Sequence, residues 1–257
     1  MAATVLSGTS GALYYKPAGT LGQFATTDVD TTGDDITVAP YLNFKVGDPV
    51  VFSVVNTTTG GSGTGTLPAG ITAGTTYYVI GYTASTGVLQ VSATSGGSAV
   101  DITDVGTATA PNKFQVEYNA FTAVSQVREW SFEITRDEID VTTIGATPGQ
   151  YVPFKTFIAG FADGSGSATV YFTDTDDALG NRMVEDVIQR IQTGAKFKLY
   201  TDQVFTSGSI DNTLSRSIEF EANLISANLS INPDDAQSVE ITFRPTSTPT
   251  FDFSKSS

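Results

Sequence analysis

The side chains of this chain that could do acid–base chemistry are almost all carboxylates. Seven of them fall on the polar sides of predicted strands or on a connection between strands: Glu129, Glu133, Glu138, Asp140, Glu219, Glu221 and Glu240. Two carboxylates about 5 to 10 Å apart are sufficient for glycoside hydrolysis. Such sites usually add aromatic rings that stack on sugars, whereas the one Trp, Trp130, falls in the core phase of its strand. The pattern favours a solvated sheet face, and a carboxylate pair that cleaves glycans stays the alternative.

Most other catalytic chemistries lack the residues that they need. The sequence has 257 residues and contains no Cys and no His. This removes the imidazole base that titrates near neutral pH, every Ser-His or Cys-His nucleophile pair, disulfide bonds and most zinc sites. We therefore predict no catalytic residue, no cofactor and no metal site.

Two local patterns imitate ligand-binding loops. The acids Asp174, Asp176 and Asp177 could begin a calcium loop, but such a loop needs Gly at its sixth position, where Leu179 stands. Because these acids lead directly into a predicted helix, capping of that helix is favoured over metal binding. The Gly-rich stretch 60–65 could cradle a phosphate, yet no Gly-Lys-Ser/Thr ending follows it, so a hairpin turn is favoured.

The chain is strongly acidic. It carries 27 Asp and Glu against 13 Lys and Arg, which gives a net charge of −14. Tight binding of nucleic acid needs cationic side chains that displace counterions from phosphates, so this charge argues against it. The first residues show no basic stretch followed by an apolar run, and about 20 apolar residues never occur together, so we expect no export signal and no membrane contact.

Hydrophobic periodicity predicts a mainly β fold with one helix. Trp130, Phe132 and Ile134 alternate with polar residues, and the same alternation recurs at 168–172, 218–224 and 239–243. The apolar phase changes between Leu224 and Ile225, which predicts a bulge or bend at that point. Apolar residues at helical spacing predict a single helix over about 177–193, lying on a sheet and followed by Gly194.

Two further segments differ from these strands in composition. Residues 26–118 are rich in Gly, Thr and Ser and contain short apolar runs at 49–55, 76–82, 87–92 and 113–118, which predicts a small all-β module. The tail after Arg244 combines prolines with Phe251 and Phe253 in a polar setting. This composition predicts an extended arm over 246–257, with the two phenylalanines as candidate contact residues.

The remainder of the chain resembles the major tail tube proteins of bacteriophages. The resemblance rests on four segments in this order: VLSGTSGALYY at 5–15, VREWSFEI at 127–134, DVTTIG at 140–145 and GSGSATVYF at 164–172. The segments FKVGDPVVF at 44–52, LPAGITAGTTYYV at 67–79 and GGSAVDITD at 96–104 resemble a β-module that is inserted in several phage virion proteins.

The resemblance implies a domain organisation and an assembly. The expected fold is a tail-tube β-sandwich or barrel with one flanking helix, formed by residues 1–25 and 119–245, with an all-β domain of residues 26–118 inserted between its first two strands. Six copies would form a ring whose inner sheets join into a wall, and the rings would stack into a tube. The inserted domain would project outward, because mass in the lumen would block DNA, and this favours a non-contractile tail without a sheath.

The resemblance also implies roles for particular residues. The lumen would be lined by some of the acids Glu129, Glu133, Glu219, Glu221 and Glu240, because carboxylates repel phosphates and keep DNA mobile. The loop at 137–153 would stack successive rings, with Asp137, Glu138, Asp140, Tyr151 and Pro153 as candidate contacts.

Partners and location follow from the same resemblance. The chain would bind copies of itself, a tail terminator, distal tail or baseplate proteins and, during assembly, a tape measure protein, with DNA only in transit. It would be made in the host cytoplasm and reside in the virion tail. A decoration or adhesin-like virion protein that binds cell-surface glycans is the alternative.

Overall fold

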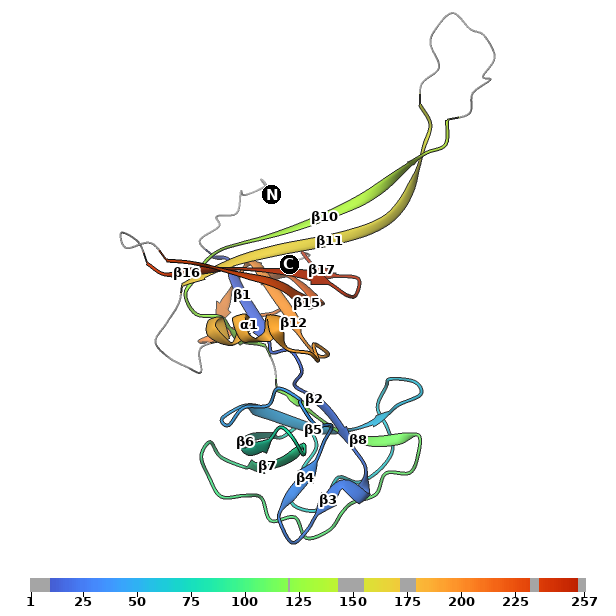
Figure 1. Cartoon of the computed structure of the whole chain (residues 1–257), viewed down its shortest axis with the longest axis vertical. Helices are drawn as coiled ribbons and strands as arrows, with labels where there is room; N and C mark the ends of the chain where they lie inside the picture. The colour runs from blue at the N-terminus through green and yellow to red at the C-terminus, as the bar shows by residue number, and fades with distance from the viewer. Residues whose placement is uncertain (1–9, 120, 143–154, 172–178, 232–235, 254–257) are drawn as a thin grey trace, which may run out of the picture.

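The computed structural model describes residues 10–119, 121–142, 155–171, 179–231 and 236–253 (Figure 1). The described part is mainly β, as predicted, with two large antiparallel sheets, a separate two-stranded sheet and one α-helix. Among the described residues, no helix has the length and apolar character needed to span a membrane.

The first sheet has eight strands, which come from both ends of the chain. They are β1 (Ala12–Lys16), β9 (Thr122–Ala123), β10 (Val127–Asp140), β11 (Phe157–Tyr171), β12 (Lys196–Asp202), β15 (Arg216–Ser230), β16 (Ser238–Pro245) and β17 (Thr250–Asp252). The strand order is β10-β11-β16-β15-β12-β1-β9, and β17 pairs with β15 beside this path. Together with the helix α1 (Leu179–Ile188), this sheet forms what we call the first unit.

The second sheet has seven strands and lies in the middle of the sequence. Its order is β2 (Leu21–Phe24), β8 (Asn112–Tyr118), β5 (Pro49–Asn56), β6 (Thr76–Thr83), β7 (Val88–Ser92), β4 (Asp35–Thr37) and β3 (Val29–Asp30). A 3-10 turn, η2 (Thr26–Asp28), precedes β3, and the small sheet is formed by β13 (Phe205–Thr206) and β14 (Ser209–Ile210). The second sheet with its loops, residues 21–118, is called the second unit.

Each unit has its own hydrophobic core, because each sheet buries one apolar face. In the first unit the rings of Phe197, Phe220 and Phe243 stack on one another with centroids 4.3 to 5.8 Å apart, and Phe132 stacks on Phe220. In the second unit Phe24 packs against Phe52 and Phe114. These aromatic clusters anchor strands that are far apart in the sequence.

The alternation of apolar residues is confirmed in the body of the first sheet, as is its phase change, but Ile134 at the end of the first run is 48% exposed and lies outside the core. Ala168, Val170, Ile241 and Phe243 are buried, as their spacing predicted. On β15 the partner of Leu224 is Phe243 and the partner of Ser226 is the adjacent Thr242, so one extra residue is inserted at position 225. This bulge moves the apolar series of β15 from even to odd positions, as the sequence indicated.

Three predicted boundaries differ from the structure. Residues 21–24 were expected in the first unit, but β2 pairs with β8 because Phe24 belongs to the second core. The helix ends at Ile188 and not near 193, because Ile191 leaves the helical stripe to pack against the second core. The expected arm at 246–257 contains a strand, β17. The predicted cap at Asp176 or Asp177 lies outside the described residues.

The crossing of β11 over the first core depends on a glycine. A Cβ on Gly166 would lie 2.3 Å from Cε2 of Phe243, whereas the nearest atom to a Cβ on Gly164 is Cγ of Pro245 at 3.2 Å. We expect Gly166→Ala to lower the free energy of unfolding by about 1 to 3 kcal/mol through overpacking. Gly164→Ala is the matched control and should cost clearly less. Denaturant unfolding of the two variants measures the difference, and equal midpoints would contradict the predicted clash.

Candidate assembly surface

The outward face of four strands in the first sheet is polar. Its strands are β10, β11, β16 and the part of β15 beyond the bulge, and their pairing fixes which residues share a row. One row is Glu129, Thr169, Glu240 and Asn228, and the next is Ser131, Ser167, Thr242 and Ser226. In the second row the hydroxyls of Ser131 and Ser167 are 3.0 Å apart, and those of Ser226 and Thr242 are 2.6 Å apart. We call this surface the polar face.

The five glutamates predicted to line a lumen do not form one group. Glu129, Glu133 and Glu240 are exposed on the polar face, and none of them takes part in an ion pair with a described residue. Glu219 and Glu221 lie on the first half of β15 beside β12, where Lys198 and Lys196 approach their carboxylates to 3.8 and 3.3 Å. Three of the five acids therefore contribute unneutralised charge to the polar face.

Within the described residues, both lateral edges of this four-stranded sheet include a stretch without a strand partner. Within the described ranges β10 pairs only with β11, so its outer edge has no strand partner. On the other side β12 pairs with β15 only up to Glu221. The side-chain amide of Gln192 then accepts from the N–H of Leu224 at 2.7 Å and donates to its carbonyl at 3.2 Å. Beyond Leu224 no described strand covers that edge.

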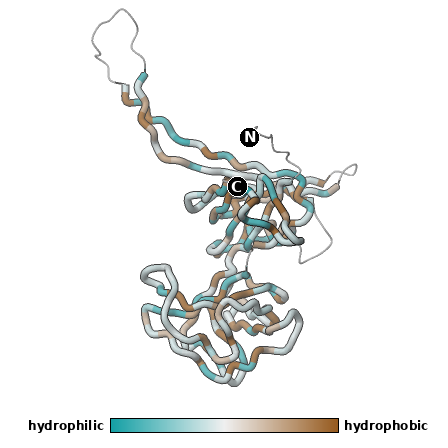
Figure 2. Tube along the Cα trace, turned by 180° about the vertical axis from the view of Figure 1, so that it is seen from behind, coloured by the Kyte–Doolittle hydropathy of each residue, from teal (hydrophilic) through white to brown (hydrophobic). Residues whose placement is uncertain are grey.

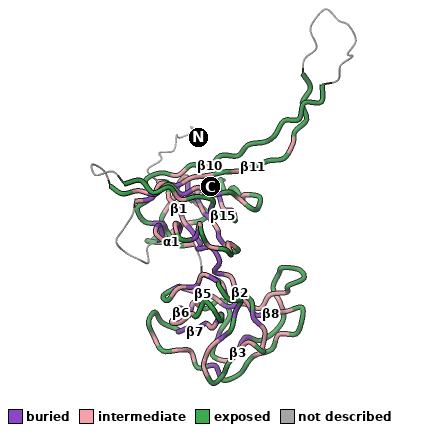
Figure 3. The backbone as a smooth tube through the Cα atoms, in the orientation of Figure 1, coloured by how far each residue is buried: buried purple, intermediate pink, exposed green. Residues whose placement is uncertain are grey.

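The hairpin of β10 and β11 extends well beyond the body of the first unit (Figure 1). Along its far part the backbone is mostly exposed and includes several hydrophobic positions (Figures 2 and 3). The large apolar residues exposed there are Ile134, Ile139, Val141, Phe157, Ile158 and Phe161. Ile139 and Ile158 are direct cross-strand partners, and each is about half exposed. Apolar side chains that stay exposed do not stabilise an isolated chain. Exposed apolar patches of this kind usually mark contacts with another protein.

The candidate stacking residues fall partly on this arm. Asp137, Glu138 and Asp140 were expected to begin a loop, but they belong to β10, because the register with β11 continues to Asp140 and Phe157. Asp140 lies 3.1 Å from the ammonium of Lys155. Tyr151 and Pro153 lie outside the described residues. At the C-terminal end, Phe251 and Phe253 are exposed and their ring centroids are 5.5 Å apart.

An ion pair that sequence inspection did not identify joins β11 to β16 near the base of the arm. Arg244 donates through Nε to Oδ1 of Asp163 at 3.1 Å and through a terminal nitrogen to the other carboxylate oxygen. These hydrogen bonds, followed by one from the backbone N–H of Gly164, hold the pKa of Asp163 below its usual range. The two residues are 81 positions apart, so no local pattern could have indicated their contact.

No known family model matches the chain, and no curated protein matches it. Among solved structures, the fold is similar to a chain in the virion of a native gene transfer agent particle, at 13% identity and a TM-score of 0.38, covering 51% of this chain and 88% of that one.

Two further solved structures show the same similarity. A chain in the tail of an empty gene transfer agent particle, with C6 symmetry, is 15% identical with a TM-score of 0.36, covering 51% of this chain and 86% of that one. A chain of the SPP1 tail tube is also 15% identical with a TM-score of 0.36, covering 54% of this chain and 71% of that one. The structural similarity therefore extends over about half of the chain.

The Asp163–Arg244 pair predicts a pH dependence. Because the pKa of Asp163 is lowered in the folded chain, its contribution to stability is present above the unfolded value of about 3.9 and is lost as pH falls through the lowered value. Carboxyl ¹³C NMR should give Asp163 a midpoint below about 3.9, and Arg244→Gln should raise that midpoint. Asp140, whose pKa is lowered by its own hydrogen bonds from Thr142 and Lys155, is the internal control and should not move. An unchanged Asp163 midpoint in Arg244→Gln would refute the assignment.

Proposed function

We propose that this chain is a structural subunit of a phage-type tail tube, in which copies join into rings, the rings stack, and the polar face lines the lumen. The observation that carries the proposal is a four-stranded sheet with an acidic, hydroxyl-rich face, in which the outer edge of β10 and the part of the β15 edge beyond Leu224 have no strand partner among the described residues. The role is structural and not catalytic. The sequence resemblance to tail tube proteins supplies the class of assembly.

Free strand edges support ring formation. An unpaired edge is an aggregation hazard that soluble monomers usually cover or interrupt. If β10 of one copy pairs with the outer half of β15 in the next, each contact is head to tail, and a fixed rotation closes such contacts into a ring. Six copies of the four strands, at a ladder spacing of about 4.8 Å, enclose a ring roughly 37 Å across, and more when the strands tilt.

The polar face supports a lumen that conducts DNA without retaining it. Each copy adds the unneutralised carboxylates of Glu129, Glu133 and Glu240 to a surface that is otherwise mainly Ser and Thr. A ring of such faces repels phosphates from all sides, so a duplex in transit stays centred and hydrated.

The position of the second unit supports its placement on the tube exterior. Helix α1 packs on the core side of the first sheet, with Met183 fully buried against it. The second unit lies beyond α1, on the side away from β10 and β11 (Figure 1). When the polar face lines the lumen, the second unit therefore projects outward. This placement leaves little room for a sheath and favours a non-contractile tail.

The arm supports stacking between rings. Among the described residues nothing covers its large apolar side chains, and a neighbouring molecule would bury them. At the ends of the tube the same surfaces would meet a tail terminator and distal tail proteins, and a tape measure protein would occupy the lumen during assembly.

The assembly prediction is tested by electron microscopy of the purified chain. We expect hollow tubes of uniform width from the parent chain, and short particles or free subunits from the double variant Ile139→Asp/Ile158→Asp, because two carboxylates cannot be buried in an apolar contact. The control is Ile188→Asp, which changes an equally apolar side chain that is 86% exposed on α1. Tubes from the double variant, or discrete parent monomers that bind glycans, would overturn the proposal.

The lumen prediction is tested by charge reversal. Tubes of the triple variant Glu129→Lys/Glu133→Lys/Glu240→Lys, assembled with a short DNA duplex, should retain DNA on sedimentation, and the retention should fall steeply with salt. Parent tubes should retain none. The control Glu219→Lys/Glu221→Lys changes acids outside the polar face and should retain much less DNA than the triple variant. Equal retention by the two variants would show that the polar face does not line the lumen.

A further inference from the structure

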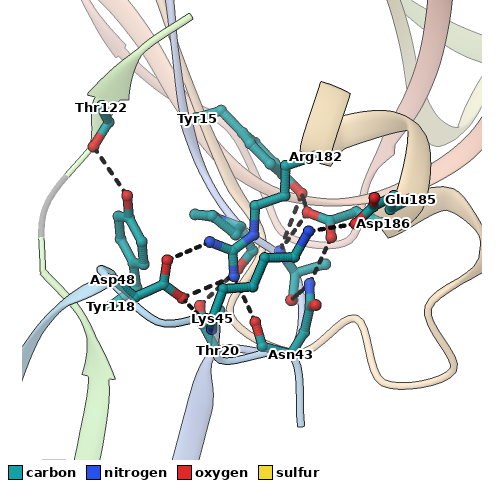
Figure 4. A network of polar contacts seen from close by, with 12 residues as sticks. Tyr15, Thr20, Asn43, Lys45, Asp48, Tyr118, Thr122, Arg182, Glu185 and Asp186 are labelled. Carbon is teal, nitrogen blue, oxygen red and sulfur yellow. Dashed lines mark hydrogen bonds and ion pairs between the residues drawn. The ribbon is translucent and has the colours of Figure 1, made fainter. Parts of the chain in front are cut away.

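One face of helix α1 is buried and contacts both units. Leu179 and Met183 pack into the core of the first unit. Arg182 and Asp186 lie beside them on the same face, are also buried, and make polar contacts that reach the second unit (Figure 4). Specific polar contacts from this face can therefore couple the two units.

The Arg182 guanidinium makes a two-pronged ion pair with Asp48 of the second unit. One terminal nitrogen lies 2.5 Å from Oδ1 and the other 2.9 Å from Oδ2, and the two side chains are 5% and 8% exposed. The second nitrogen also donates to the carbonyl of Asn43, and the guanidinium lies 5.8 Å from the ring centroid of Tyr118. Burial lowers the pKa of Arg182, but the hydrogen bonds and charge of Asp48 more than offset this, so the pKa is raised and the group stays charged.

The Asp186 carboxylate accepts hydrogen bonds from three separate segments of the chain. It accepts from the hydroxyl of Tyr15 at 2.7 Å, from the side-chain amide of Asn43 at 2.6 Å and from the N–H of Ala18 at 3.2 Å. Tyr15 belongs to β1 of the first unit, Ala18 to the linker, and Asn43 to the second unit. Burial raises the pKa of Tyr15 well above its usual value, with the Asp186 charge adding to this, so the hydroxyl remains a donor.

The two segments that connect the units, residues 17–20 and the stretch that follows β8, are also held by specific contacts. The ammonium of Lys16, just before the first segment, lies 2.5 Å from a carboxylate oxygen of Glu117 beside the second. Gly19 donates its N–H to the carbonyl of Thr193 at 3.0 Å and accepts from the N–H of Asn43 at 2.8 Å. A Cβ at Gly19 would lie 2.5 Å from the carbonyl oxygen of Ile191, so the linker is in close backbone contact with the segment after α1.

We propose that Arg182 and Asp186 of α1 hold the second unit in a fixed orientation relative to the first. A force on the second unit, or a partner bound to it, would then act directly on strands β15 and β16 of the first sheet. The alternative is a tethered module that swings on its two linkers. A buried, two-pronged ion pair fixes direction as well as distance, and salt screens it little. The proposal concerns a single chain, so it stands or falls independently of tube formation.

The absence of Cys allows a direct test, because two introduced cysteines are the only labelling sites. Ser85→Cys in the second unit and Thr248→Cys in the first are both exposed positions for spin labels. Labelled full-length chains, diluted into unlabelled parent chains, report the intramolecular distance by pulsed electron paramagnetic resonance. We expect one narrow distance distribution in the parent, unchanged between low and molar salt.

The first test variant is Arg182→Met, which keeps an unbranched side chain but removes the guanidinium and with it the ion pair. We expect it to broaden the distance distribution at least twofold. The control is Lys45→Met, which removes the more exposed ion pair with Glu185 at the same junction and should leave the distribution narrow. Asp186→Asn is the second test variant, and it applies also if Arg182→Met does not fold. A broad distribution in the parent, or folded test variants as narrow as the control, would overturn the proposal.

Discussion

A strand edge without a partner presents a row of N–H and C=O groups that must be satisfied by water or by another chain. In the first unit, within the described residues, the outer edge of β10 and the part of the β15 edge beyond Leu224 are in this state. This constraint orders the other features. In the proposed assembly these edges pair between copies to close a ring, the polar face lies as a whole on one side of that ring, and the arm extends to a neighbouring ring. The second unit and α1 are attached on the other side of the sheet, where they do not obstruct the edges.

Much of the fold could be predicted from the sequence, because it depends on short-range periodicity. Alternation around Trp130 and Phe132 indicated the strand, and the change of phase at Leu224 indicated the bulge, since a bulge moves every later side chain to the other face. The runs in the inserted stretch also predicted its main strands to within about a residue. The helix end could not be predicted, because Ile191 fits the helical stripe equally well and is removed from it only by the second core.

The candidate site was less predictable, because it depends on contacts between distant segments. Five glutamates look equivalent in the sequence, yet two of them face lysines of β12 and three do not. The charged residues of α1 gave even less indication of their contacts. Arg182 and Asp186 look like ordinary helix charges, and their partners Asp48 and Tyr15 are 134 and 171 positions away. No local pattern distinguishes a solvated helix face from one that is buried against another unit.

The two places where the chain enters and leaves the second unit lie side by side. β1 and β9 are antiparallel partners, with Tyr14 opposite Ala123 and Tyr15 opposite Thr122, so their Cα atoms are about 5 Å apart. A tight turn could therefore bridge that gap, and the first sheet would be topologically complete without residues 21–118. The inserted module is in this sense a cassette, which recombination could remove or exchange without reordering the first sheet. Any replacement must still satisfy the buried guanidinium of Arg182, which limits the modules that the same scaffold can accept.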